Sequence, residues 1–224
     1  MFEFHKNRKK YFKMQVNNAA QFVIPFIEQK IKITSGMQVL EIGCGEGGVL
    51  KAFINKGCIG VGVELDESRL VNAREWLKED IDSNKIQFIS KDIYQVNPAI
   101  EFPYLFDIIV LKDVIEHIHD QKKLMGWMQQ FLKPGGAIYF GFPPWQMPFG
   151  GHQQIAHSFL SRLPYIHLLP RPLYKGLLKL NNEPVDELLE IRQTRISIEK
   201  FESICYDTGY QILHQLLGDL EIYF

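Results

Sequence analysis

The stretch Val39-Leu-Glu-Ile-Gly-Cys-Gly-Glu-Gly-Gly48 decides the fold of this chain. A short apolar run leads directly into a glycine-rich turn, and a segment with the residue types of a helix follows. Glycines at 43, 45 and 47 let the backbone turn sharply where any Cβ would block a ligand. The N–H groups at the start of the next helix then point outward, toward polar or anionic groups. The stretch therefore predicts a strand, a turn and a helix, with a ligand site at the turn.

A second apolar run, Ile59-Gly-Val-Gly-Val63, is followed immediately by Glu64. A carboxylate at the end of the second strand, about 20 residues after a glycine turn, can accept hydrogen bonds from both hydroxyls of a ribose. The glycine turn and this acid together predict a pocket for a nucleoside.

The identity of the nucleoside depends on the acids around the turn. Gly43, Gly45 and Gly48 also fit the G-x-G-x-x-G pattern of dinucleotide sites, so a nicotinamide or flavin protein remains an alternative. Glu41, directly before the glycines, would repel a pyrophosphate and attract an amino group or a cation. Asp92, after a third apolar run, offers a second acid suited to an adenine amino group. These acids favour a ligand that carries adenosine, a sulfonium and a free amino acid, without phosphate.

Two further segments complete the pattern along the chain. A fourth apolar run, 106–111, is followed by Lys112-Asp-Val-Ile-Glu-His117, and Leu132-Lys-Pro-Gly-Gly136 leads into a fifth run. In this order and spacing, the set resembles the class I S-adenosylmethionine-dependent methyltransferases over roughly residues 36 to 141. Within the set, Val114-Ile-Glu-His-Ile118 is most similar to the small-molecule branch that includes ubiquinone-type O-methyltransferases.

The resemblance and the alternation of apolar and helical segments predict an α/β fold. We expect a doubly wound, mostly parallel seven-stranded sheet in a single domain, 1–224, whose ligands bind at the carboxyl ends of the strands. Its parts are N-terminal helices at 1–35, a cofactor-binding core at 36–141, a substrate-recognising insertion at 142–190, and a C-terminal helix and strands at 191–224. The last two strands are expected at 210–216 and 219–224.

The resemblance also implies the roles of individual residues toward S-adenosylmethionine, or toward the product S-adenosylhomocysteine. The methionine end would meet Glu41 and the backbone of Lys112, and the turn of Gly43, Cys44 and Gly45 would line the cofactor. The ribose would meet Glu64. The adenine would meet Leu65, Asp92 and Ile93.

The residue that removes a proton from the acceptor is less evident from the sequence. His117 is the leading candidate, because a histidine titrates near working pH and this one follows the fourth strand; packing is the alternative for its side chain. His152, after two glycines of the insertion, is the next candidate. Asp113, Glu116 and His117 also match the place where some quinone O-methyltransferases are thought to hold a divalent ion. On a regular helix Glu116 and His117 would face different ways, so we expect no metal.

The insertion is rich in proline and aromatic residues. Residues 174–180 predict a short amphipathic helix with Tyr174, Leu177, Leu178 and Leu180 on one face. This helix would lie at a membrane interface, cover an apolar substrate or pack as a lid on the core. Phe142-Pro-Pro-Trp145 differs in place and chemistry from the Asn/Asp-Pro-Pro-Tyr motif of methyltransferases that act on nucleic-acid nitrogens, so we expect no nucleic-acid substrate.

The composition is that of an ordinary globular enzyme. The 224 residues are 46% hydrophobic and carry a formal net charge of −1, which argues against disorder and against binding of nucleic acid by bulk charge. Three scattered cysteines indicate a reducing compartment. No apolar run reaches the length of about 18 residues that spans a membrane, and the charged N-terminus is unlike a secretory signal. We therefore expect a cytoplasmic protein.

The predicted function is methyl transfer from S-adenosylmethionine to a small or lipid-like acceptor, with oxygen as the expected atom. Two alternatives remain from the sequence: a module that binds S-adenosylmethionine without turnover, and a nicotinamide-dependent oxidoreductase. Peripheral contact with a membrane is compatible with the amphipathic segment. The sequence identifies neither the acceptor nor the oligomeric state.

Overall fold

The structure is a computed structural model that describes residues 7–215. The chain divides into two compact units, and we describe each by itself. One unit contains Lys9–Lys112 and Gly126–Phe140, with residues 211–215. The other contains Asp113–Met125 and Gly141–Tyr210, with residues 7–8. We refer to them as the sheet unit and the insertion unit.

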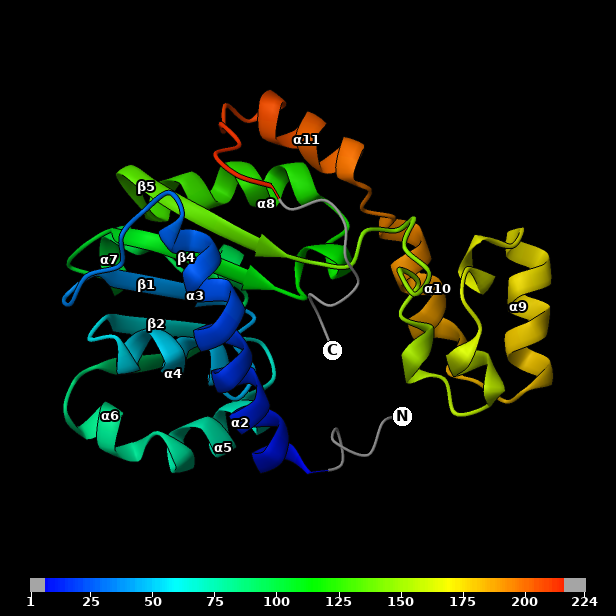
Figure 1. Cartoon of the computed structure of the whole chain (residues 1–224), viewed down its shortest axis with the longest axis horizontal. Helices are drawn as coiled ribbons and strands as arrows, with labels where there is room; N and C mark the ends of the chain where they lie inside the picture. Colours follow the sequence, from blue (N-terminus) through cyan, green and yellow to red (C-terminus); the bar gives the residue numbers. More distant parts are fainter. Residues whose placement is uncertain (1–6, 216–224) are drawn as a thin grey trace. The chain divides into compact units, whose positions relative to one another are not determined.

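The sheet unit is built on a five-stranded sheet with the order β3-β2-β1-β4-β5 (Figure 1). The pairings of β1 with β2, of β1 with β4 and of β2 with β3 are all parallel. Leu40 of β1 aligns with Val61 of β2 and with Ile109 of β4. The five strands are β1 (Gln38–Ile42), β2 (Ile59–Glu64), β3 (Ile86–Ser90), β4 (Phe106–Lys112) and β5 (Leu132–Gly141).

The central strands consist almost entirely of apolar residues because both faces of the sheet are covered. Leu40, Ile108 and Ile109 are fully buried at its centre. Asp107 connects the beginnings of β1, β4 and β5. Its carboxylate, near the start of β4, accepts hydrogen bonds from the Gln38 N–H of β1 (2.7 Å) and from the Lys133 ammonium of β5 (2.8 Å). The sheet thus places the carboxyl ends of β1, β2, β3 and β4 at one edge, where the predicted ligand residues lie.

Helices follow both β1 and β2. The Asp66 carboxylate accepts a hydrogen bond from the Ser68 N–H (2.9 Å) and caps the helix after β2. Leu70, Ala73 and Leu77 face inward and are buried. The helical elements after these strands are α4 (Gly48–Asn55), α5 (Glu67–Trp76), α6 (Lys78–Asp82), η2 (Ile93–Gln95) and α7 (Pro98–Glu101).

The N-terminal helical segment consists of α2 (Arg8–Asn18), a π-helical turn η1 (Ala19–Val23) and α3 (Ile24–Glu28). Pro25 has no N–H to donate to the preceding turn, which explains the wider turn before it. The wider turn changes which residues face the core after Asn18. Ala19 is buried, whereas Ala20, which would share the buried side of a regular α-helix with Val16 and Val23, is exposed.

The insertion unit is made mostly of short turns and helices. Its core contains Leu160, Tyr174, Leu178 and Leu188, all fully buried. Its elements are η3 (Ile115–His117), η5 (Gln153–Ile155), η6 (Phe159–Arg162), η7 (Ile166–Leu168), α9 (Arg171–Leu180), α10 (Val185–Thr194) and α11 (Ile198–Asp207). Helix α8 (Gln121–Met128), followed by η4 (Gln129–Phe131), passes from this unit into the sheet unit.

The described residues contain five strands, so the expected count of seven is not reached. Residues 210–215 form no strand, and Ile212 and Leu213 are 40% and 50% exposed instead of covered on both faces. Leu216 and the expected strand 219–224 lie outside the described residues. The expected boundary of the insertion at residue 190 falls inside α10, which runs to Thr194. Across residues 7–215, every helix is too short or too polar to cross a lipid bilayer.

Candidate cofactor and proton-transfer sites

The glycine turn after β1 requires backbone conformations that side chains disfavour. Gly43, Gly45 and Gly47 have φ angles of 71°, 53° and 79°. The N–H groups of Gly43 and Cys44 both donate to the Val63 carbonyl, at 2.8 and 3.2 Å. These bonds fix the turn against the end of β2, where the sequence places the ribose carboxylate.

Glu64 connects the glycine turn to the beginning of α5. Its carboxylate accepts hydrogen bonds from the Gly45 N–H (2.8 Å) and the Asp66 N–H (3.0 Å). A carboxylate has about four lone-pair sites, so two remain for hydroxyl groups of a ligand. Leu65, next in the chain, exposes 72% of its surface and offers an apolar contact for a flat ring.

Glu41 is buried in β1 with only 4% of its surface exposed. It accepts a hydrogen bond from the Leu50 N–H of α4 (2.9 Å). Burial raises the pKa of this carboxyl from 4.5 to about 8; the Leu50 hydrogen bond and the Lys112 charge oppose the rise, and Glu64 adds to it. A cation placed beside Glu41 would favour its ionised form. The site therefore fits a ligand with an ammonium or sulfonium group.

Cys44 fills the space beside β2. Burial raises the pKa of its thiol well above the ordinary value, with Glu41 adding to the effect, which rules out a reactive thiolate. A Cβ on Gly62 would lie 2.6 Å from the Cys44 sulfur and 2.8 Å from the Phe88 ring. Gly62 was not among the residues predicted from the sequence. A glycine inside a strand, as in the Gly-Val-Gly pattern of β2, is nevertheless typical of a position where another group packs closely against the backbone.

Asp92 follows the end of β3 closely, as predicted. The Asp92 carboxylate accepts a hydrogen bond from the Tyr94 N–H (2.9 Å) and so begins the turn η2. Ile93 is buried, and its carbonyl accepts a hydrogen bond from the Trp127 indole (2.9 Å). Strand β4 ends at Lys112, one residue later than the expected end at residue 111. All of the predicted cofactor residues therefore lie in the sheet unit.

Helix α2 packs tightly against the glycine turn. A Cβ on Gly48 would lie 2.7 Å from Gln15 and 2.9 Å from the Phe12 carbonyl. The Phe12 ring also meets the Trp76 ring of α5 edge-on, with centroids 5.4 Å apart. The N-terminal helix thus covers the start of α4, beside the glycine turn.

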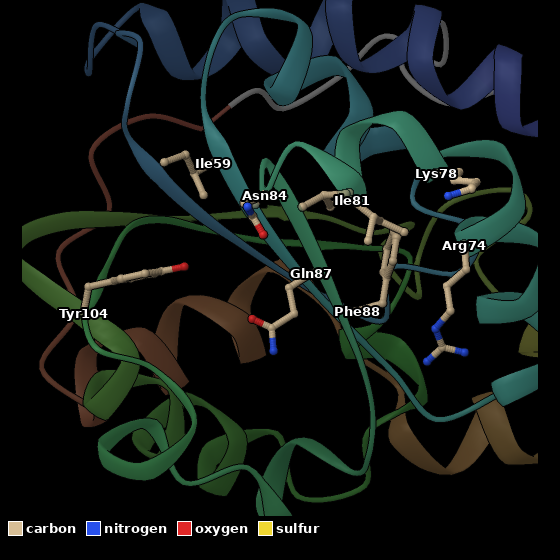
Figure 2. A pocket seen from close by; sticks show the side chains of 10 residues that line it. Ile59, Arg74, Lys78, Ile81, Asn84, Gln87, Phe88 and Tyr104 are labelled. Carbon is tan, nitrogen blue, oxygen red and sulfur yellow. The ribbon is translucent and has the colours of Figure 1, made fainter.

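A separate hollow of about 610 Å³ runs along the edge strand β3 (Figure 2). Ile59, Asn84 and Ile86 line it at the amino ends of β2 and β3, and Arg74 and Tyr104 also contribute. None of the predicted cofactor residues lines this hollow, so it is distinct from the predicted cofactor site.

The insertion unit brings both candidate proton acceptors together. The rings of His117 and His152 meet edge-on, with centroids 5.2 Å apart. The carboxylate of Glu116, which is 2% exposed, lies 3.5 Å from His152 Nε2. Neither Glu116 carboxylate oxygen has a hydrogen-bond partner within the described residues. A buried carboxylate beside two imidazoles is a grouping that would hold a cation.

The backbone around this cluster is fixed by three hydrogen bonds. The N–H of Asp113, whose φ is 57°, donates to the Gly141 carbonyl (2.7 Å). The Thr194 hydroxyl donates to the Glu116 carbonyl, and the Gln121 amide donates to the Ile115 carbonyl (3.2 Å). Neither residue was predicted from the sequence: the Thr194 contact joins residues 78 positions apart, and no motif marks the Gln121 hydrogen bond, which spans six residues.

The cluster corrects our expectation for Glu116 and His117. The two residues lie in a tight 3-10 turn rather than on a regular helix, and one ligand atom from each, with one from His152, lies within 4.8 Å of the others. Asp113 is not in this group. A carboxylate and two imidazoles are acceptable ligands for divalent ions. Loss of solvent around the ring and the neighbouring His152 lower the pKa of His117, whereas Glu116 opposes the change, so the neutral imidazole is favoured.

Comparison with protein-family models connects these features to a known family. A model described as "Methyltransferase domain" matches residues 13–215. The chain therefore belongs to the methyltransferase domain family, with the fold of class I S-adenosylmethionine-dependent methyltransferases. The expected class of enzyme and the expected cofactor are confirmed at this level.

Curated relatives match about half of the chain. Ubiquinone biosynthesis O-methyltransferase from Coxiella burnetii is 29% identical over 122 residues, which are 52% of this chain and 47% of that protein. The protein of the same name from Thiobacillus denitrificans is 30% identical over 106 residues, 47% of this chain and 44% of that protein. The chain thus spans about half the length of the curated relatives it matches.

Solved structures show the same fold at low identity. The plantazolicin methyltransferase BpumL, in complex with a pentazolic desmethylPZN analog and SAH, has a TM-score of 0.61 at 15% identity, over 92% of this chain and 67% of that chain. Phosphoethanolamine N-methyltransferase 2 from Haemonchus contortus, in complex with S-adenosyl-L-methionine, has a TM-score of 0.53 at 22% identity, over 83% and 35%. These likenesses support the fold assignment and leave the acceptor open.

Proposed function

We propose that this protein transfers the methyl group of S-adenosylmethionine to an oxygen of a small or lipid-like acceptor. The observation that carries the proposal is the junction of the glycine turn with Glu64 and the buried Glu41. It combines hydrogen-bond acceptors for a ribose with a carboxyl that a cation would ionise. The curated relatives named ubiquinone biosynthesis O-methyltransferase support oxygen as the acceptor atom.

Nine residues of the sheet unit would hold the cofactor. Glu41 and Lys112 would meet the amino-acid end, Glu64 would accept hydrogen bonds from the ribose, and the exposed Leu65 would pack on the adenine. The full set is Glu41, Gly43, Cys44, Gly45, Glu64, Leu65, Asp92, Ile93 and Lys112. When bound, S-adenosylmethionine supplies a methyl group already activated by the positive charge on sulfur. The protein then has to align the acceptor and exclude water, which contributes about 7–11 kcal/mol in well-oriented reactions.

An oxygen acceptor also requires a base for its proton. We assign this role to His117 or His152, because both are imidazoles beside the buried Glu116 carboxylate. A neutral imidazole takes the proton of the acceptor hydroxyl, and Glu116 stabilises the imidazolium that forms. The same three groups would alternatively bind a divalent ion, which would lower the pKa of an acceptor hydroxyl.

The substrate-recognising part is proposed to be the proline- and aromatic-rich segment 142–190. A cytoplasmic location is proposed as well, because Cys44, Cys58 and Cys205 are all unpaired thiols.

The proposal is tested by methyl transfer from labelled S-adenosylmethionine to phenols with and without an apolar chain. Purified wild-type protein is compared with His117→Ala, His152→Ala and the control His119→Ala, whose imidazole is exposed at the surface. We expect at least one of the first two variants to lose about 10²–10⁴-fold in kcat, with unchanged affinity for S-adenosylhomocysteine.

A second set of reactions contains a chelator and then added magnesium. Activity that disappears with the chelator and returns with the ion would assign the Glu116 cluster to metal binding. Transfer to amines but not to phenols would contradict oxygen as the acceptor atom. Cofactor binding without transfer to any acceptor would favour the non-catalytic module.

A further inference from the structure

The insertion unit carries a stretch of chain with charge of one sign. Residues 142–182 contain Arg162, Arg171, Lys175 and Lys179 but no aspartate or glutamate. The whole chain, in contrast, has 25 basic and 26 acidic residues. Positive charge without any compensating acid in the same stretch favours a negatively charged partner.

The same stretch exposes large apolar side chains to an unusual degree. A single exposed leucine is ordinary, whereas a group of them indicates an interaction surface. Seven lie between residues 159 and 180: Phe159 (60% exposed), Leu163 (38%), Tyr165 (49%), Leu168 (45%), Leu169 (37%), Leu173 (63%) and Leu180 (83%).

Helix α9, whose position in the chain is labelled in Figure 1, carries both kinds of side chain. Tyr174 and Leu178, four residues apart, face the core of the insertion unit and are fully buried. Leu173 and Leu180, seven residues apart, share a second side that is exposed. We expected Leu180 on the same apolar face as Tyr174 and Leu178; its 83% exposure, beside two fully buried residues, corrects this.

The cations of α9 lie on a third side of the helix. Lys175 and Lys179 are four residues apart and exposed, so they share one side. Gly176 lies between the leucine side and the lysine side, and a Cβ there would meet no atom within 4 Å. The outward half of α9 is therefore flat at its centre, with leucines along one flank and lysines along the other.

We propose that the exposed leucine and lysine sides of α9 dock on the surface of an anionic phospholipid bilayer. A helix of this kind lies in the plane of the interface, with its apolar side chains at the acyl boundary and its lysines reaching back to the phosphates. A second copy of this chain is a poorer partner, because two surfaces of the same positive charge would repel each other. The proposal does not depend on the methyl-transfer function.

The experiment is co-sedimentation of the full-length protein with vesicles. Vesicles of phosphatidylcholine alone are compared with vesicles that also contain phosphatidylglycerol, at low salt and at about 0.5 M salt, where charges are strongly screened. We expect binding to the anionic vesicles at low salt, weaker binding at high salt and little binding to phosphatidylcholine.

Two double variants separate the two halves of the surface. Each lysine near an anionic membrane contributes about fivefold in affinity, so Lys175→Glu with Lys179→Glu should weaken binding by at least about 25-fold. Leu173→Ser with Leu180→Ser should weaken binding to a similar degree without changing the charge. The matched controls lie in the sheet unit: Lys30→Glu with Lys32→Glu, both exposed lysines, and Ile100→Ser, an isoleucine that is 80% exposed.

Circular dichroism and binding of S-adenosylhomocysteine establish that each variant is folded. Equal loss in the α9 variants and in the controls would overturn the proposal, because it would indicate a general effect of charge or apolarity. Absence of sedimentation with anionic vesicles would also overturn it. Self-association in light scattering that the α9 variants abolish, without binding to lipid, would assign the surface to a second copy of the chain instead.

Discussion

Glu41 provides the most quantitative prediction, because its carboxyl is buried and its pKa is raised to about 8. The perturbation is Glu41→Gln, which keeps the shape of the side chain and an oxygen for the Leu50 N–H but removes the titration. A ligand that places an ammonium or sulfonium beside Glu41 requires the ionised form. Binding should therefore strengthen as the pH rises toward 8.

The expected size follows from the fraction of ionised carboxyl. With a pKa of about 8, roughly 3% of Glu41 is ionised at pH 6.5 and roughly half at pH 8. The affinity of the wild-type protein for S-adenosylhomocysteine should thus rise about 15-fold over this range. Binding at pH 7 should release nearly one proton, because about nine-tenths of the carboxyl is protonated before the ligand binds.

The stability of the free protein should change in the opposite direction. The folded state keeps the Glu41 proton up to about pH 8, whereas the unfolded state loses it above about 4.5. Stability from this group is therefore fully present below pH 4.5 and is lost as the pH rises to 8, by about 5 kcal/mol at most. Glu41→Gln should be more stable than the wild type at pH 8.

The assay is calorimetric titration with S-adenosylhomocysteine at pH 6.5, 7 and 8, in buffers that differ in ionisation enthalpy. Urea unfolding at the same pH values measures stability. Glu75→Gln, at an exposed site of α5, is the matched control. If Glu41→Gln showed the same pH dependence of affinity as the wild type, the assigned role of Glu41 would be refuted.

Three other predictions concern packing and thiol chemistry. Gly62→Ala should destabilise the protein by about 1–3 kcal/mol in urea unfolding, because the new Cβ would lie 2.6 Å from the Cys44 sulfur; an unchanged midpoint would contradict the packing. Leu178→Ala should cost about 2–5 kcal/mol, since this side chain is fully buried in the insertion unit, whereas Leu173→Ala on the exposed flank should cost much less. The buried thiols, including Cys44, should resist a thiol reagent until urea is added; fast labelling of the native protein would show that they are accessible.

The sequence was sufficient for the features that depend on local chemistry. The glycine turn and the strand ends at Glu64 and Asp92 were predicted, because each depends on residues close in the chain. Parallel strands then bring these ends to one edge, so local patterns were enough to predict that these residues lie at the same edge of the sheet.

Features that depend on distant contacts were harder to predict. Glu116 and His152 are separated by the whole of β5, and their contact depends on a tight turn that no periodicity indicates. The exposure of Leu180 could not be predicted either, since periodicity gives the faces of a helix but not which face is covered. Residues 210–215 have apolar side chains typical of a strand, yet a strand also needs a partner to accept its hydrogen bonds.

The central claim is that the glycine turn and Glu64 form a site for S-adenosylmethionine. Calorimetric titration of the wild type, Glu64→Ala and the exposed control Glu75→Ala with S-adenosylhomocysteine, and separately with NADH, tests it most directly. We expect the wild type and the control to bind S-adenosylhomocysteine but not NADH, and Glu64→Ala to bind at least about 100-fold more weakly, since two hydrogen bonds to a charged group are lost. Binding of NADH instead, or equal affinity in Glu64→Ala, would contradict the claim.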